Sequence, residues 1–199
     1  MSAVVPDAPR GPGRPRVEEF DGLILDAALA IIDEGGDVTV SAVVARSGVS
    51  RAALYRRWPS LTALIAAALD VGRTVPPEFP EDGDLREAVL DSLTDGASAH
   101  GYSEHRFRQR MRLVMSDRTL QKAYWSAHVA RRRLPLERAL RVAADRGELR
   151  ADIDVEACFD AIAGAVYYQL VVRGDRLDAP ETRERLRSAL DVIWRGMTA

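Results

Sequence analysis

The sequence has little of what enzyme active sites and metal centres are usually built from. It holds a single cysteine, Cys158, so it can form no intramolecular disulfide and no cluster of thiolate metal ligands. Of its three histidines, His100, His105 and His128, none forms an HExxH-type pair, and no glycine-rich phosphate loop is present. We therefore expect no enzyme, no catalytic residue, no metal and no cofactor.

Long apolar runs are also missing from the sequence. No run approaches the roughly 18 apolar residues that a membrane span needs. The first sixteen residues, MSAVVPDAPRGPGRPR, lack the continuous apolar segment of a signal peptide and are interrupted by four prolines. Together with the lone cysteine, these features predict a soluble protein of the reducing cytoplasm with no membrane partner.

The charge of the chain is balanced overall but uneven along its length. The 199 residues carry a formal net charge of −2. The segment 38–69 nevertheless contains no acidic residue and four arginines, at Arg46, Arg51, Arg56 and Arg57. A local basic patch on an otherwise acidic protein indicates an acidic partner such as nucleic acid.

Apolar residues recur at helical spacing through most of the chain. Phe20, Ile24, Ala27 and Ile31, for example, follow one another at steps of four, three and four. Because strand-type alternation is absent, we predict an all-α protein of about nine helices. The prolines and glycines of VGRTVPPEFPEDGD, residues 71–84, mark a connection. We thus predict a flexible basic arm at 1–16, a three-helix helix-turn-helix domain at 17–72 and a larger helical domain at 73–199.

Two short helices joined by a tight turn form a helix-turn-helix candidate. Thr39 and Ser50 are capping residues for the two helices, and Gly48 permits the turn between them. The second helix, which Pro59 ends, is narrow enough for a DNA major groove about 12 Å wide. Arg51 at its start is placed to reach a guanine edge or a phosphate, whereas Tyr55, Arg56 and Arg57 suit phosphate contacts. The alternative is a solvated basic helix on some other helical protein.

Several segments resemble TetR-family transcriptional regulators. GRPR at 13–16, ILDAALAIIDEGG at 24–36 and VTVSAVVARSGVSRAALYRRWPS at 38–60 are similar to the family's N-terminal domain. RGELRADIDVEACFDAIAGAVYYQL at 146–170 is similar to the C-terminal ligand-binding domain of one branch. The resemblance implies a homodimeric repressor that a small-molecule effector releases from a palindromic operator in double-stranded DNA.

The resemblance also implies roles for individual residues. The positions that match the family's DNA contacts are Thr39, Ser50, Arg51, Ala53, Tyr55 and Arg56, and those of the minor-groove arm include Arg14 and Arg16. Leu61 departs from the lysine usual in the family, and Ala53 departs from a common threonine. These departures keep open an alternative, a helical interaction module that has lost DNA binding.

The C-terminal part supplies candidates for a dimer interface and an effector pocket. For the interface we predict apolar residues of the last two helices, namely Phe159, Ile162, Val166, Leu170, Leu186, Leu190, Ile193 and Trp194. They would form a four-helix bundle with a second copy, unless they are intramolecular core. For the effector pocket we predict a mixed aromatic and polar set: His100, Phe107, Met111, Tyr124, Trp125, His128 and Tyr167.

Overall fold

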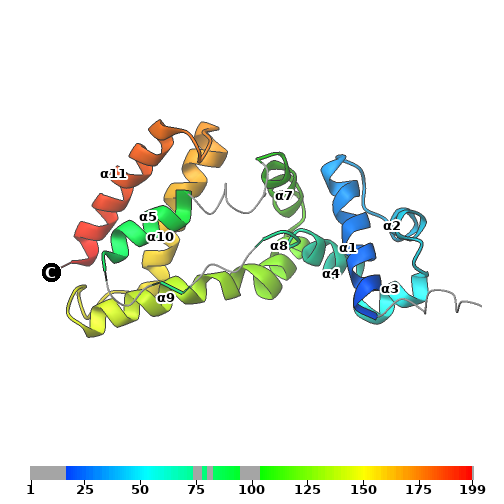
Figure 1. Ribbon diagram of the computed structural model, residues 1–199, viewed down its shortest axis with the longest axis horizontal. Coiled ribbons are helices and arrows are strands. Elements are labelled where there is room, and N and C mark those ends of the chain that lie inside the picture. The colour runs from blue at the N-terminus through cyan, green and yellow to red at the C-terminus, as the bar shows by residue number, and fades with distance from the viewer. Residues whose placement is uncertain (1–16, 74–77, 80–82, 95–103, 199) are drawn as a thin grey trace, which may run out of the picture.

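The structure, a computed structural model, describes residues 17–73, 78–79, 83–94 and 104–198. These residues form helices and no strand, as Figure 1 shows, which confirms the all-α prediction. The helices are α1 (Val17–Asp33), α2 (Val40–Ser47), α3 (Arg51–Arg57), α4 (Leu61–Ala68), α5 (Leu85–Thr94), α7 (Glu104–Ser116), α8 (Arg118–Tyr124), α9 (Ala130–Asp145), α10 (Val155–Tyr167) and α11 (Pro180–Met197). Two π-helical segments, η1 (Trp125–Val129) and η2 (Tyr168–Arg173), continue α8 and α10.

The helix-turn-helix is built from the capping residues that the sequence indicates. The Thr39 hydroxyl accepts a hydrogen bond from the Ala42 amide at 3.1 Å, and α2 ends where Gly48 adopts a φ of 69°. The Ser50 hydroxyl starts α3 in the same way by accepting from the Ala53 amide at 3.3 Å. These contacts satisfy amides that the first helical turn leaves free, and they fix where each helix begins.

The described residues divide between two apolar cores. The first core joins the helices of the helix-turn-helix to α7 and α8, through residues such as Ile24, Leu54, Leu64 and Tyr124. The second core joins α5, α9, α10 and α11. The first core therefore extends past residue 72, where we predicted the DNA-binding domain to end. In Figure 1, the helix-turn-helix and α11 lie at opposite ends of the molecule.

A single helical rod, α8–η1–α9, runs from the first core to the second. The spacing of apolar residues predicts one helix over about 120–146 with a bend at Pro135. The structure differs, because the α-helical pattern is interrupted at η1 and α9 continues through Pro135. The interruption coincides with a long-range contact, because His128 of η1 reaches Asp70; within the rod, Tyr124 stacks on His128 with 5.8 Å between ring centroids. Local sequence carries no sign of such contacts.

Candidate nucleic-acid interface

Helix α3 presents a basic face to solvent. Arg51, Ala52, Tyr55 and Arg56 are exposed, with 44% of the Tyr55 surface accessible, whereas Leu54 on the opposite side is fully buried. Arg51 and Arg56 have no acidic partner within the described part of the chain. A short helix that is anchored by one apolar residue and cationic on its outer side has the form needed to enter a major groove.

The other two arginines of the basic segment pair with carboxylates, one within α1 and one in the turn directly after it. Arg46 donates two hydrogen bonds to Glu34, at 2.7 and 2.6 Å, and this contact lowers the pKa of the Glu34 carboxyl. Arg57 lies 3.1 Å from Asp21. The count of four unopposed arginines over 38–69 therefore falls to two in three dimensions. The prediction that Arg57 contacts phosphate has to account for this competition with Asp21.

The remaining predicted DNA-binding residues differ in how exposed they are. Thr39 and Ser50 lie on the exposed surface, and because the Ser50 oxygen accepts from an amide, its hydroxyl hydrogen is still available to a phosphate, whereas the Thr39 hydroxyl also shares a hydrogen bond of 3.2 Å with the Ser41 hydroxyl. Ala53 is partly buried against the first core, which reduces the methyl surface that it offers to a base. Arg14 and Arg16 lie outside the described residues. All of these assignments stay predictions.

Comparison with known proteins covers both parts of the chain. Residues 24–68 match the bacterial regulatory proteins of the tetR family, and residues 79–189 match the tetracyclin repressor-like C-terminal domain. The HTH-type transcriptional regulator YdeS of Bacillus subtilis is 28% identical over 183 residues, which span 89% of this chain and 91% of YdeS. Regulator Rv1556 of Mycobacterium tuberculosis is 26% identical over 184 residues, 92% of this chain and 87% of its own.

Solved structures give the same result. The TetR family transcription regulator SCO0332 superposes with a TM-score of 0.63 at 26% identity, covering 91% of this chain and all of that chain. GusR of Salmonella enterica superposes with a TM-score of 0.69 at 19% identity, covering 89% of this chain and 96% of GusR, and this likeness supports the fold alone.

The two-part helical fold, its exposed basic helix and these matches define a helix-turn-helix transcriptional regulator. The C-terminal match alone spans more than half of the chain. The chain belongs to the TetR family of transcriptional regulators.

The residues predicted for the effector pocket lie in different parts of the structure. Tyr124 and His128 lie at the junction with α4, where Arg73 donates to the Tyr124 hydroxyl and His128 contacts Asp70. Phe107 of α7 and Tyr167 of α10 pack together, with 6.3 Å between ring centroids. Trp125 lies beside Arg133 in a cation–π contact of 5.3 Å, Met111 packs against the first core, and His100 lies outside the described residues.

None of these residues lines a cleft that lies between α9 and the segment leading into α5. That cleft has a volume of about 240 Å³, and its walls include Phe79, Leu85, Pro135 and Val142. The six predicted residues that the structure describes thus lie away from this cleft, and their role in effector binding stays a prediction. Phe107, Trp125 and Tyr167 remain the group of candidates on the α10 side of the molecule.

Several residues predicted for the dimer interface lie instead inside the chain's own core. Ile162, Leu186 and Leu190 are 2–3% exposed, so this conformation leaves them no surface for a partner. Phe159, Val166, Ile193 and Trp194 pack against the same core, and Leu170 is half-buried. The intramolecular alternative holds for these buried positions because α5 and α9 cover the face of the hairpin on which they lie.

The opposite face of the α10–α11 hairpin is exposed, and its residues are not among the eight that we predicted for the interface, although the apolar stretch 161–172 with Gly164 already favoured close helix contact. It carries small residues at Ala157, Ala161 and Gly164, followed by Tyr168 and Val172, which are 53% and 66% exposed. On α11, Ser188, Val192 and Gly196 are exposed at steps of four. This four-residue repeat is visible in the sequence, but the larger apolar side chains of the inner face obscure it.

Proposed function

We propose that the protein is a homodimeric repressor that binds a palindromic operator through two copies of α3. The observation that carries the proposal is the exposed cationic face of α3, on which Arg51 and Arg56 have no carboxylate partner among the described residues. Arg51 at the N-terminal end of α3 suits readout of a base edge, and Arg56 suits a phosphate.

The proposed second copy packs on the outer face of the α10–α11 hairpin. The segment Val155–Arg173 is no uninterrupted apolar run, because Glu156 and Asp160 lie within it, but its mean hydropathy of 1.3 and its length match those of a membrane span, and only 11% of it is buried. Exposed apolar surface of this kind on a transcriptional regulator favours contact with another protein surface. The small residues Ala161 and Gly164 permit close approach of a partner helix.

The proposed effector is a small molecule that contacts Phe107, Trp125 and Tyr167. Trp125 and Tyr167 are 46% and 43% exposed, and Tyr167 also contacts the Phe107 ring, so these aromatic side chains offer accessible apolar surface to a ligand. Effector binding would favour a conformation whose two α3 helices no longer match the operator, and it would thereby release the DNA.

Selection from random duplexes with the full-length protein tests DNA binding directly. We expect enrichment of an inverted repeat, and mobility shifts on that sequence should weaken steeply with added salt because phosphate contacts release counterions. Absence of any enriched sequence, and of any shift at low salt, would contradict the proposal and favour the helical interaction module.

A further inference from the structure

The segment η1 lies where the α8–η1–α9 rod passes between the two cores. Tyr124 at the end of α8 belongs to the first core, and Leu136 and Leu140 of α9 belong to the second. None of the five residues of η1 is itself buried. Only Val129 of the segment packs against the first core, and a π-helical turn with so little buried surface between two packed regions has the features of a locally weak element.

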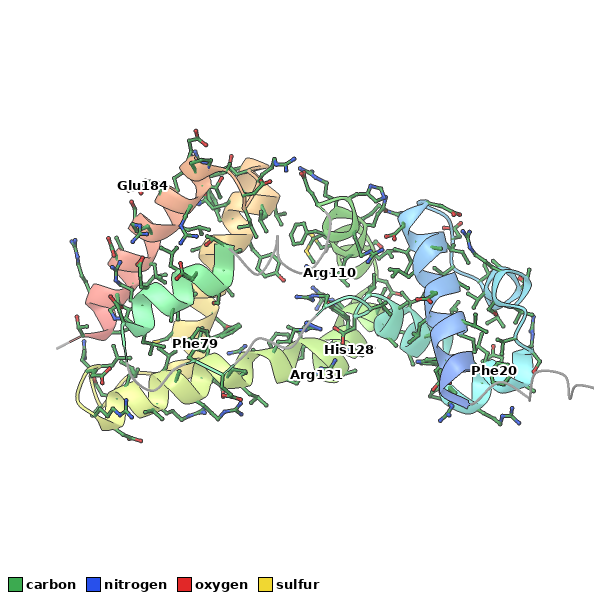
Figure 2. The ribbon with its side chains drawn as sticks, viewed as in Figure 1. Phe20, Phe79, Arg110, His128, Arg131 and Glu184 are labelled. Atoms are coloured by element: carbon green, nitrogen blue, oxygen red, sulfur yellow. The ribbon has the colours of Figure 1, made fainter. Side chains whose placement is uncertain are left out.

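A single carboxylate joins the helix-turn-helix to the rod at this segment. Asp70 follows α4, whose Leu64 and Ala68 are buried in the first core. Its side chain is 9% exposed and lies 3.0 Å from Nδ1 of His128, and both Arg131 and Arg132 donate to it. Arg132 also donates to the backbone carbonyl of Arg73 at 3.2 Å. Figure 2 shows His128 and Arg131 beside the end of α4.

The charges of this cluster hold Asp70 in its ionised form. Burial raises the pKa of the Asp70 carboxyl, but the hydrogen bond from His128 and the charges of Arg132, His128 and Arg131 outweigh that effect and bring the pKa below its usual value. Removing the charge of Asp70 leaves Arg131 and Arg132 of α9 without this anion, and the contact between the end of α4 and the rod weakens.

We propose that η1 is a hinge between the two cores and that Asp70 is the positioning residue that holds this hinge in one orientation. A change on the effector side that moves α9 alters the contacts of Arg131 and Arg132 with Asp70, and so alters the orientation of the helix-turn-helix. The consequence for DNA rests on the proposed function, whereas the hinge itself does not.

The test measures the distance across the hinge within one chain. In a Cys158→Ser background, cysteines replace Ala52 on α3 and Ala151 after α9, both exposed, and spin labels report their distance distribution after dilution with unlabelled protein. We expect a narrow distribution for the reference protein and a clearly broader one for Asp70→Asn. An Asp70→Asn distribution as narrow as the reference would overturn the proposal.

A matched variant separates hinge control from general loss of an ion pair. Asp160→Asn also removes a carboxylate from an arginine of α9, Arg133, at 2.9 Å, but that contact joins α9 to α10 within one core. It should leave the distribution narrow, and equal broadening in both variants would overturn the proposal. Asp70→Glu keeps the charge and should therefore give a distance distribution narrower than that of Asp70→Asn. A distribution as broad as that of Asp70→Asn would also count against the hinge proposal.

The same variants connect the hinge to DNA. On the selected operator, Asp70→Asn should weaken binding about tenfold, a coupling of the size that residues outside a binding site commonly exert. Asp160→Asn should bind as the reference does, and equal operator affinity for both variants would contradict the link between hinge and DNA. If the reference protein binds no DNA at all, the proposed function fails, while the distance measurement still decides the hinge.

Discussion

At the scale of single residues, the DNA-binding surface is defined as much by carboxylates as by arginines. Four arginines occur in the acid-free segment 38–69, but Asp21 of α1 pairs with Arg57, and Glu34 in the turn after α1 pairs with Arg46. Only Arg51 and Arg56 keep charges that no carboxylate of the described residues opposes. The proposed readout therefore depends on these two side chains.

The first residue-scale prediction concerns Arg51. Arg51→Ala should weaken operator binding by about 1–3 kcal/mol while changing non-specific affinity much less, because a base contact is lost and few phosphate contacts are. Competition titrations with operator and with random duplex measure both affinities. An equal loss of the two would assign Arg51 to phosphate.

The second residue-scale prediction concerns the pH dependence of stability at Asp70. The lowered pKa means that the folded state keeps this carboxyl ionised at lower pH than the unfolded state does. Its stabilisation is therefore complete above the unfolded pKa of about 4 and is lost as the pH falls through the lowered folded pKa. Urea unfolding of the reference and of Asp70→Asn should show a gap in stability at pH 7 that shrinks toward pH 3. A gap that does not change with pH would contradict the assignment.

At the scale of elements, sequence signals predict the helices well where the causes are local. Thr39, Gly48, Ser50 and Ser60 set the bounds of α2, α3 and α4 through their own backbone geometry and hydroxyl groups. The π-helical turn η1 could not be predicted, because Asp70, which contacts it, is more than fifty residues away in the chain. The burial of Ile162, Leu186 and Leu190 within the chain could not be predicted for a similar reason, since apolar periodicity cannot distinguish packing inside one chain from packing against a second copy.

The prediction at this scale concerns the turn between α2 and α3. Gly48 has a φ of 69°, and an added Cβ would meet no atom within 4 Å, so Gly48→Ala suffers from backbone strain alone. We expect a loss of about 1 kcal/mol in the free energy of unfolding. Gly22→Ala in α1, where the backbone is helical and the space also open, should instead gain about 0.5–1 kcal/mol. Urea denaturation measures the free energy of unfolding of both variants, and an equal change in the two would show that the turn imposes no backbone strain.

At the scale of the whole molecule, the account requires two copies joined through the outer face of the α10–α11 hairpin. The inner face of this hairpin is buried in the second core, as the burial of Ile162 and Leu190 shows. One copy of α3 contacts too few base pairs for useful specificity, whereas a two-fold pair reads two half-sites at a fixed separation.

Tyr168→Asp tests this arrangement by placing a charge on the outer face without entering the core. Sedimentation of the variant should show monomers, because the carboxylate would be desolvated between the two copies. Met115→Asp, at an apolar residue of α7 that is 70% exposed, should leave the dimer intact. A dimer that persists in Tyr168→Asp would move the interface elsewhere.

The most direct test of the central claim, that α3 lies against DNA phosphates, is the salt dependence of operator binding in Arg56→Ala. Each phosphate contact contributes about 0.9 to the slope of log K against log salt concentration, so loss of one contact per copy should reduce the slope of a dimer by about 2. Arg150→Ala, at an exposed arginine after α9 that pairs with Asp152, is the control and should leave the slope unchanged. A slope that is the same in Arg56→Ala as in the reference protein would contradict the account.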